Sequence, residues 1–369
     1  MGGVRMGWIG LYDNEQSLFS PHGLQKCAGL NGENAPENDA LLVTGTLVAE
    51  TRVPATGKLQ PLLIYNQGGE WPLHLALHAI PGGGLSLVLD QGGMPLHQSI
   101  SHSETGRTEI LRVSYAWDSI KRWAQLTVER PQDDYVITVP VTSPRPLRIK
   151  DAKAILFPGP NRYVSPEVEF IALSSDVEPV GPTPSLAPDT PVLTTDGYVP
   201  VGKLRRGDLV VSRNDRVVPV LNIVERVLPA RGSFRPLRIR APFFGLWRDI
   251  DVSANQRLML SGSEVEYMFG RQAVLLSTRH LVGTPRVYYP KCGPLAKYVQ
   301  VLLPDHDVLE TAGTFTESLF VGRIRRNTQL FERSILHGFG RAYLPEHGMP
   351  TEPVLRAFDA TVLAERSVA

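Results

Sequence analysis

The chain has 369 residues, of which 42% are hydrophobic and 20% are charged. This length suits two domains, each with a core of its own, and the composition excludes a disordered or membrane-embedded chain. The net charge is only +1, yet residues 1–180 carry 14 Lys and Arg against 19 Asp and Glu, whereas residues 181–369 carry 24 against 18. Because the arginines of the second half are scattered without a dense basic run, nucleic acid is not an expected partner.

The N-terminal apolar run is interrupted at Asp13, too early for a secretory signal peptide. We therefore expect a cytoplasmic protein, or one exported by a non-classical route. No uninterrupted stretch of about 18 apolar residues occurs, so no membrane span is expected. The chain's two cysteines, Cys27 and Cys292, lie far apart and predict neither a disulfide framework nor a zinc site.

Residues 41–175 form a series of short alternating segments separated by Gly, Pro and Asp, which predicts about ten to twelve strands of an all-β sandwich. In LHLALHAI and LSLVLD the leucines alternate around the turn at residues 81–84, which predicts a hairpin with one buried face. On such a strand His74 and His78 would lie roughly 13 Å apart, too far to share a metal ion. The segments RVSYAWD, AQLTVER, YVITVPV, LRIKDAKAILF and VEFIAL supply further predicted strands.

The runs RVSYAWDSIKRWAQLTVE, LRIKDAKAILF and VEFIAL follow one another in an order that resembles concanavalin-like or laminin-G-like jelly rolls. The resemblance covers about 130 residues and rests on strand rhythm. It implies a glycan or another surface ligand as a possible partner, with calcium in many members, although no residue can be assigned to a ligand. The alternative is a purely structural sandwich.

Four prolines in EPVGPTPSLAP favour an extended connector near residue 180. We therefore predict a sandwich over residues 1–178, a linker over 179–184 and a second domain over 185–369. The second domain is again rich in short strands, and its end changes to helical spacing in NTQLFERSIL and PVLRAFDATVLAER. Pro353 suits the start of the last helix.

The segment SLAPDTPVLTTDGYVPVGKLRRGDLVVSRND resembles the opening block of bacterial Hint domains, the hedgehog and intein type. Those domains begin with a nucleophile, followed by a strand, an Asp-Gly turn and a Gly-Asp pair, here Ser185, 190–194, 196–197 and 207–208. Further blocks occur in similar order: LRIRAPFFG, DVSANQRLMLSG, VLLSTRHLVG, YVQVLLPDHDVLETAGTFTESLFVG and PVLRAFDATVLAE. The resemblance implies an all-β horseshoe fold with a short helical end, in a chain that is mainly β.

The resemblance also implies a set of self-processing residues. Hint domains usually place Cys at the first position, Thr or Ser followed three residues later by His in the second block, and another His near the end. The matching positions here hold Ser185, Ser253, Gln256 and His306. Ser253 could instead be an ordinary turn residue, as could His306, and no metal or cofactor is implied.

Two of these residues weaken the expected chemistry. A serine hydroxyl is a poorer nucleophile than a cysteine thiol near neutrality, and the amide of Gln256 cannot supply a proton to a departing nitrogen. The attacked carbonyl would belong to Pro184, whose ring limits twisting of the scissile bond. The sequence thus leaves two hypotheses open: a non-catalytic or weakly cleaving two-domain protein, or active self-cleavage before Ser185.

Overall fold

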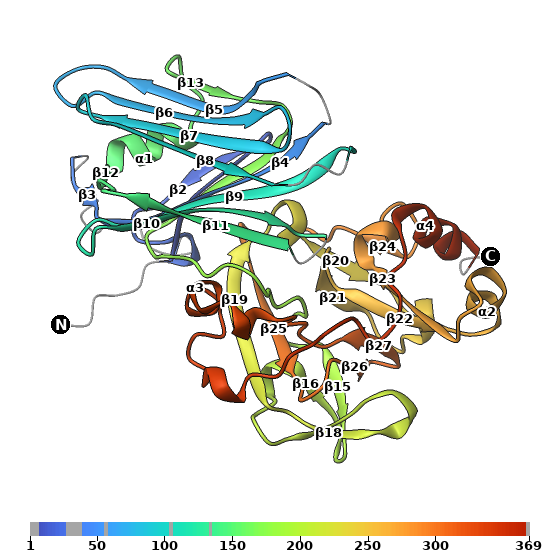
Figure 1. Ribbon diagram of the computed structural model, residues 1–369. Helices are drawn as coiled ribbons and strands as arrows, with labels where there is room; N and C mark the ends of the chain where they lie inside the picture. The colour runs from blue at the N-terminus through green and yellow to red at the C-terminus, as the bar shows by residue number, and fades with distance from the viewer. Residues whose placement is uncertain (1–6, 27–38, 55–57, 103–105, 133–134, 367–369) are drawn as a thin grey trace. The chain divides into compact units, whose positions relative to one another are not determined.

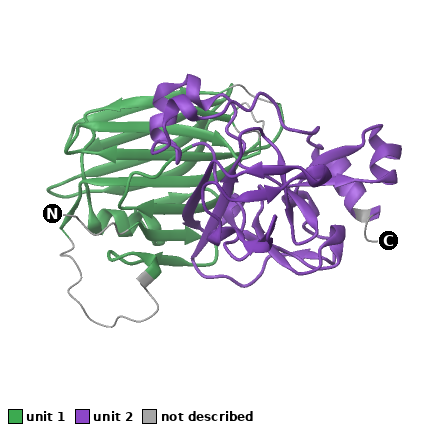
Figure 2. Ribbon diagram, turned by 90° about the horizontal axis from the view of Figure 1, so that it is seen from below, with its two compact units in different colours: residues 1–180 green, residues 181–369 purple. Residues whose placement is uncertain are grey.

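The computed structural model describes residues 7–26, 39–54, 58–102, 106–132 and 135–366 (Figure 1). Two compact units divide the chain, residues 1–180 and residues 181–369, and Figure 2 colours them separately. Cys27 lies outside the described residues, whereas Cys292 is free and exposed. None of the helices in the described part of the chain has the length and apolar character needed to cross a lipid bilayer.

The first unit is a sandwich of two antiparallel sheets with a shared core. One sheet has the order β11-β10-β9-β4-β14-β1-β2 and the other the order β13-β5-β6-β7-β8. The elements are β1 (Trp8–Asp13), β2 (Ser17–Phe19), β3 (Leu41–Leu42), β4 (Thr44–Val53), β5 (Gln60–Gln67), β6 (Leu73–Ile80), β7 (Gly84–Gln91), β8 (Pro95–Ser101), β9 (Glu109–Asp118), β10 (Trp123–Arg130), β11 (Tyr135–Thr142), β12 (Leu147–Arg148), α1 (Ile149–Leu156), β13 (Arg162–Val164) and β14 (Val168–Ser174). The predicted jelly-roll-like sandwich is therefore confirmed.

Alternation decides which side chains fill this core. Leucines at every second position of the paired strands β6 and β7 are buried, as the hairpin prediction required. Tyr115 and Trp117 of β9 reach the same core from the other sheet, and their rings stack 5.5 Å apart. His74 and His78 are partly buried and lie on the face of β6 opposite its leucines.

One predicted strand of this unit is wrong. LRIKDAKAILF forms only the two-residue strand β12 and then the helix α1. Leu147 and Ile149 alternate like strand residues, but Ala152, Ile155 and Leu156 follow at helical spacing and are all buried. These three side chains pack into the apolar core of the sandwich. This packing stabilises a helix instead of a strand.

The second unit is built mainly from one large sheet with the order β18-β17-β15-β26-β27-β22-β23, to which β16 is added at β15. Smaller sheets have the orders β19-β25 and β21-β20-β24. The elements are β15 (Pro191–Thr194), β16 (Gly197–Pro200), β17 (Leu209–Val211), β18 (Val217–Pro219), β19 (Asn222–Pro229), β20 (Pro236–Ile239), β21 (Ile250–Ser253), β22 (Arg257–Ser261), α2 (Ser263–Phe269), β23 (Ala273–Ser277), β24 (Val287–Tyr288), β25 (Leu295–Leu302), β26 (Val308–Thr311), β27 (Thr314–Glu317), α3 (Thr328–Arg333) and α4 (Ala357–Arg366).

The C-terminal end is helical, as its spacing predicted, in α3 and α4. Asn327 caps α3 by accepting a hydrogen bond from the Leu330 amide. The role expected for Pro353 is wrong, since its carbonyl accepts from the amide of Leu275 in β23. The chain is still extended there, and α4 begins only at Ala357 because this short pairing with the sheet holds the preceding residues straight.

Candidate functional site

The segment that begins at Ser185 lies between two strands of the second unit. The amide of Leu186 donates to the carbonyl of Val299 in β25 at 3.2 Å, and the amide of Ala187 donates to that of Asp251 in β21 at 3.0 Å. The Ser185 carbonyl accepts from the amide of Ser253 at 2.7 Å. Ser185 is buried, with 7% of its surface exposed, so both its backbone and its hydroxyl have fixed surroundings.

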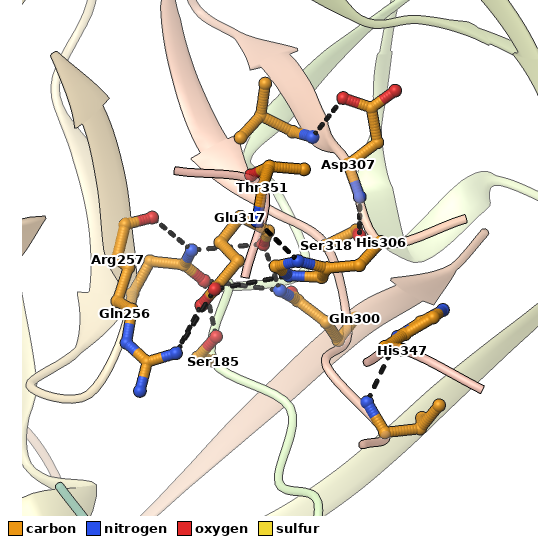
Figure 3. Close-up of polar contacts among 12 residues, drawn as sticks. Ser185, Gln256, Arg257, Gln300, His306, Asp307, Glu317, Ser318, His347 and Thr351 are labelled. Carbon is orange, nitrogen blue, oxygen red and sulfur yellow. Dashed lines mark hydrogen bonds and ion pairs between the residues drawn. The ribbon is translucent and has the colours of Figure 1, made fainter. Parts of the chain in front are cut away.

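Gln256 lies at the turn between β21 and β22 and points its amide at Ser185 (Figure 3). Its Nε2 donates to the carbonyl of Arg257 at 2.7 Å and to that of Glu317 at 3.1 Å. Two carbonyl neighbours can only receive N–H donors, so the amide has one permitted orientation. Its Oε1 therefore faces Ser185, and the Ser185 hydroxyl donates to this oxygen.

Ser253 meets this site through its backbone. Besides donating to Ser185, it offers its carbonyl to the amide of Gln256 at 3.0 Å and to the hydroxyl of Thr278 at 3.0 Å. These bonds shape the turn that presents Gln256, because they close the chain between β21 and β22. The positions that the sequence matched as Ser185, Ser253 and Gln256 are thus brought together in space.

Gln300 of β25 is the residue of this site that the sequence did not reveal as a candidate. Its Nε2 donates to the Glu317 carbonyl at 2.6 Å and lies 3.3 Å from Gln256 Oε1. It is 2% exposed and lies between the buried residues Val299 and Val301 of this strand. A buried amide needs partners, so a glutamine inside the run YVQVLL was the available signal for a polar neighbour.

The fourth matched residue, His306, belongs to a neighbouring cluster instead (Figure 3). Its Nε2 lies 3.2 Å from Oε1 of Glu317, a contact that becomes an ion pair when the ring is protonated. Arg257 Nη1 lies 3.2 Å from the same carboxylate oxygen. Nδ1 accepts from the amide of Thr351 at 3.2 Å, which leaves Nε2 as the protonated nitrogen of the neutral ring.

Glu317 connects the two groups, but through different atoms. Its backbone carbonyl accepts from the glutamines beside Ser185, whereas its carboxylate contacts Arg257 and His306. Among the contacts of the described residues, none joins the imidazole of His306 to Ser185 or Gln256. The structure therefore separates His306 from the nucleophile position with which the sequence had grouped it.

The ring of His347 lies beside the ring of His306. The two rings are 5.4 Å apart, and His347 Nδ1 accepts from the amide of Val321 at 3.2 Å. Burial, followed by the charge of His306, lowers the pKa of His347 to about 4. The neutral ring is therefore the form that fits the folded protein.

This low pKa predicts a loss of stability in mild acid. The unfolded chain binds the proton near pH 6.5, before the folded chain does, so stability falls as pH drops from about 6.5 toward 4. Between pH 7.5 and pH 5 the contribution of His347 to the free energy of unfolding should fall by about 2 kcal/mol. Urea denaturation of wild type and His347→Gln at both pH values should show this difference. The exposed His337→Gln is the control, and an equal pH dependence for wild type and His347→Gln would contradict the prediction.

Comparison with known proteins identifies the second unit. Residues 184–323 match the family model described as the Hint domain. This chain carries a Hint domain. The match begins one residue before Ser185 and ends after β27, so it contains Ser185, Gln256, Gln300, His306 and Glu317, whereas His347 and Thr351 lie beyond it.

Several solved structures are similar to part of the chain. The MchDnaB-1 intein (N145AA) is 15% identical, with a TM-score of 0.24, and covers 36% of this chain and 98% of its own. The Ssp DnaB mini-intein variant M86 is 9% identical, with a TM-score of 0.27 and coverages of 39% and 99%. A CBM40 of the Ruminococcus gnavus IT-sialidase is 17% identical, with a TM-score of 0.25 and coverages of 47% and 77%. No curated protein matches the chain.

Proposed function

We propose that this is a two-domain protein whose Hint domain retains the scaffold of a self-processing domain without cleaving the Pro184–Ser185 bond. The observation that carries the proposal is the hydrogen bond from the Ser185 hydroxyl to the amide oxygen of Gln256. An amide oxygen is not a base near neutral pH, so this contact holds the hydroxyl proton without removing it.

Cleavage would require two proton movements at this site. Ser185 Oγ would have to lose its proton and bond to the carbonyl carbon of Pro184, while the bond from that carbon to the Ser185 nitrogen breaks. The nitrogen must then take up a proton, leaving an ester. Both hydrogens of Gln256 Nε2 are directed at backbone carbonyls, and an amide does not release protons near neutrality.

The ionisable groups nearby are engaged elsewhere. Glu317 directs its carbonyl toward Gln256 and its carboxylate toward Arg257 and His306. His306 is fixed between that carboxylate and the Thr351 amide. Neither group contacts the Ser185 hydroxyl, which supports a silent processing site.

Mass spectrometry of the purified full chain tests this proposal. We expect a single intact mass after several days at neutral pH, with and without a thiol or hydroxylamine, which would cut any ester that formed. Fragments beginning at Ser185 would overturn the proposal and favour active self-cleavage.

Glycan binding by residues 1–178 stays a separate prediction. It is supported by the sandwich fold, which is shared by binding and non-binding proteins. Full chain that captures no oligosaccharide on a glycan array would count against it.

A further inference from the structure

Two large aromatic side chains are exposed on the Hint domain, far along the chain from Ser185. Trp247, in the loop before β21, has 53% of its surface exposed, and Tyr198 of β16 has 40%. Their rings meet edge to face with centroids 5.2 Å apart. Exposed Trp and Tyr side chains held together in this way are typical of recognition surfaces rather than of ordinary protein surface.

The backbone holds Trp247 rigidly despite its exposure. The Trp247 amide donates to the carbonyl of Ala312 at 2.9 Å. Gly313 has a φ of +94°, and a Cβ there would lie 2.5 Å from the carbonyl oxygen of Gly245 and 3.1 Å from Cδ1 of Trp247. Ala312 itself has a φ of +50°, which non-glycine residues rarely adopt. The loops that carry Trp247 and Gly313 are thus in close contact beside the indole ring. The indole therefore has little conformational freedom to lose when a ligand binds.

The patch contains both acceptors and a donor, because the carboxylate of Glu310 contacts Tyr198 and the guanidinium of Arg248 follows Trp247 in the chain. The Tyr198 hydroxyl donates to Glu310 Oε1 at 2.7 Å, so its proton is already used. Oε2 of the same carboxylate remains as a further acceptor. Asp189 lies 3.9 Å from Arg248, and both side chains are about half exposed or more. A fitting ligand therefore brings an apolar face for the indole and polar groups that both donate hydrogen bonds to the carboxylates and accept them from Arg248.

We propose that the Trp247 patch, formed by Trp247, Tyr198, Glu310, Arg248 and Asp189, binds a saccharide. The C–H face of a sugar ring would stack on the indole, and ring hydroxyls would donate to the carboxylates. A proline-rich peptide fits less well, because proline has no backbone N–H to donate to the carboxylates of Glu310 and Asp189. The proposal is independent of whether the bond before Ser185 is cleaved.

The test uses labelled full chain on an array of oligosaccharides that also carries proline-rich and lysine-rich peptides. Wild type should bind at least one oligosaccharide, and Trp247→Ala should weaken that binding by about tenfold or more, as expected for a central aromatic contact. Trp71→Ala is the matched control, because Trp71 is 66% exposed but lies in the other unit. Glu310→Gln, which keeps an acceptor for Tyr198, should also weaken binding while leaving the melting temperature unchanged.

Three results would overturn the proposal. The first is an array on which wild type binds no oligosaccharide. The second is oligosaccharide binding that persists at full strength in either Trp247→Ala or Glu310→Gln, or that is lost only in Trp71→Ala, which would place it on the sandwich. The third is binding that depends on Trp247 but occurs only on the peptides. Because Glu310→Gln alters a surface carboxylate alone, it decides the matter even if Trp247→Ala fails to fold.

Discussion

The double variant Ser185→Cys, Gln256→His is expected to cleave the bond before residue 185, whereas the parent chain stays intact. A thiol, with a reference pKa of about 8.5, supplies some thiolate near neutrality. An imidazole in place of the amide could protonate the departing nitrogen, an effect worth about 10² to 10⁴ in rate. The backbone of residue 185 is already fixed by Ser253, so the new groups would start close together. Fragment masses measured over time, with added thiol, give the rate.

Two further variants show which change matters. Ser185→Cys alone keeps the amide of Gln256 and should cleave far more slowly than the double variant. Ser185→Ala combined with Gln256→His has no nucleophile and should not cleave at all. If the double variant remains intact while its melting temperature matches the parent, the site lacks the processing geometry itself, and the proposal that only the side-chain chemistry is missing would be wrong.

Glu317→Gln is expected to destabilise the Hint domain by about 3 kcal/mol, the cost of removing one partner from a buried ion pair. The Arg257 and Glu317 side chains are only 10% and 9% exposed, so the guanidinium would lose its nearby carboxylate in a poorly solvated place. His306 Nε2 would lose the same charge. Urea denaturation followed by circular dichroism should show the shift in the transition of the second unit.

A surface pair provides the matched control for this measurement. Glu225 and Lys297 also form an ion pair, at 2.7 Å, but both side chains are nearly half exposed. Glu225→Gln should therefore cost less than about 1 kcal/mol. Equal losses for Glu225→Gln and Glu317→Gln would show that burial does not set the strength of the Glu317 contacts.

Predictions from the sequence succeeded where the signal was local. Alternating leucines predicted the strands β6 and β7, and apolar residues at helical spacing predicted the helices α3 and α4. Both patterns involve only neighbouring residues, and both predictions are confirmed. The helix α1 was missed because its first residues alternate like those of a strand. Only the packing of Ile155 and Leu156 into the sandwich core distinguishes the two conformations.

The sequence by itself was enough to match Ser185 and Gln256 to positions of a Hint domain, because the ordered blocks can be aligned without coordinates. Only the tertiary structure decided what those side chains contact. Gln300 reaches Gln256 across 44 residues of chain, and His306 is turned toward Glu317. Strand register and long-range hydrogen bonding fix these contacts. No periodic pattern in the sequence predicts these contacts. They place the amide oxygen of Gln256, which cannot take up a proton near neutral pH, opposite the Ser185 hydroxyl.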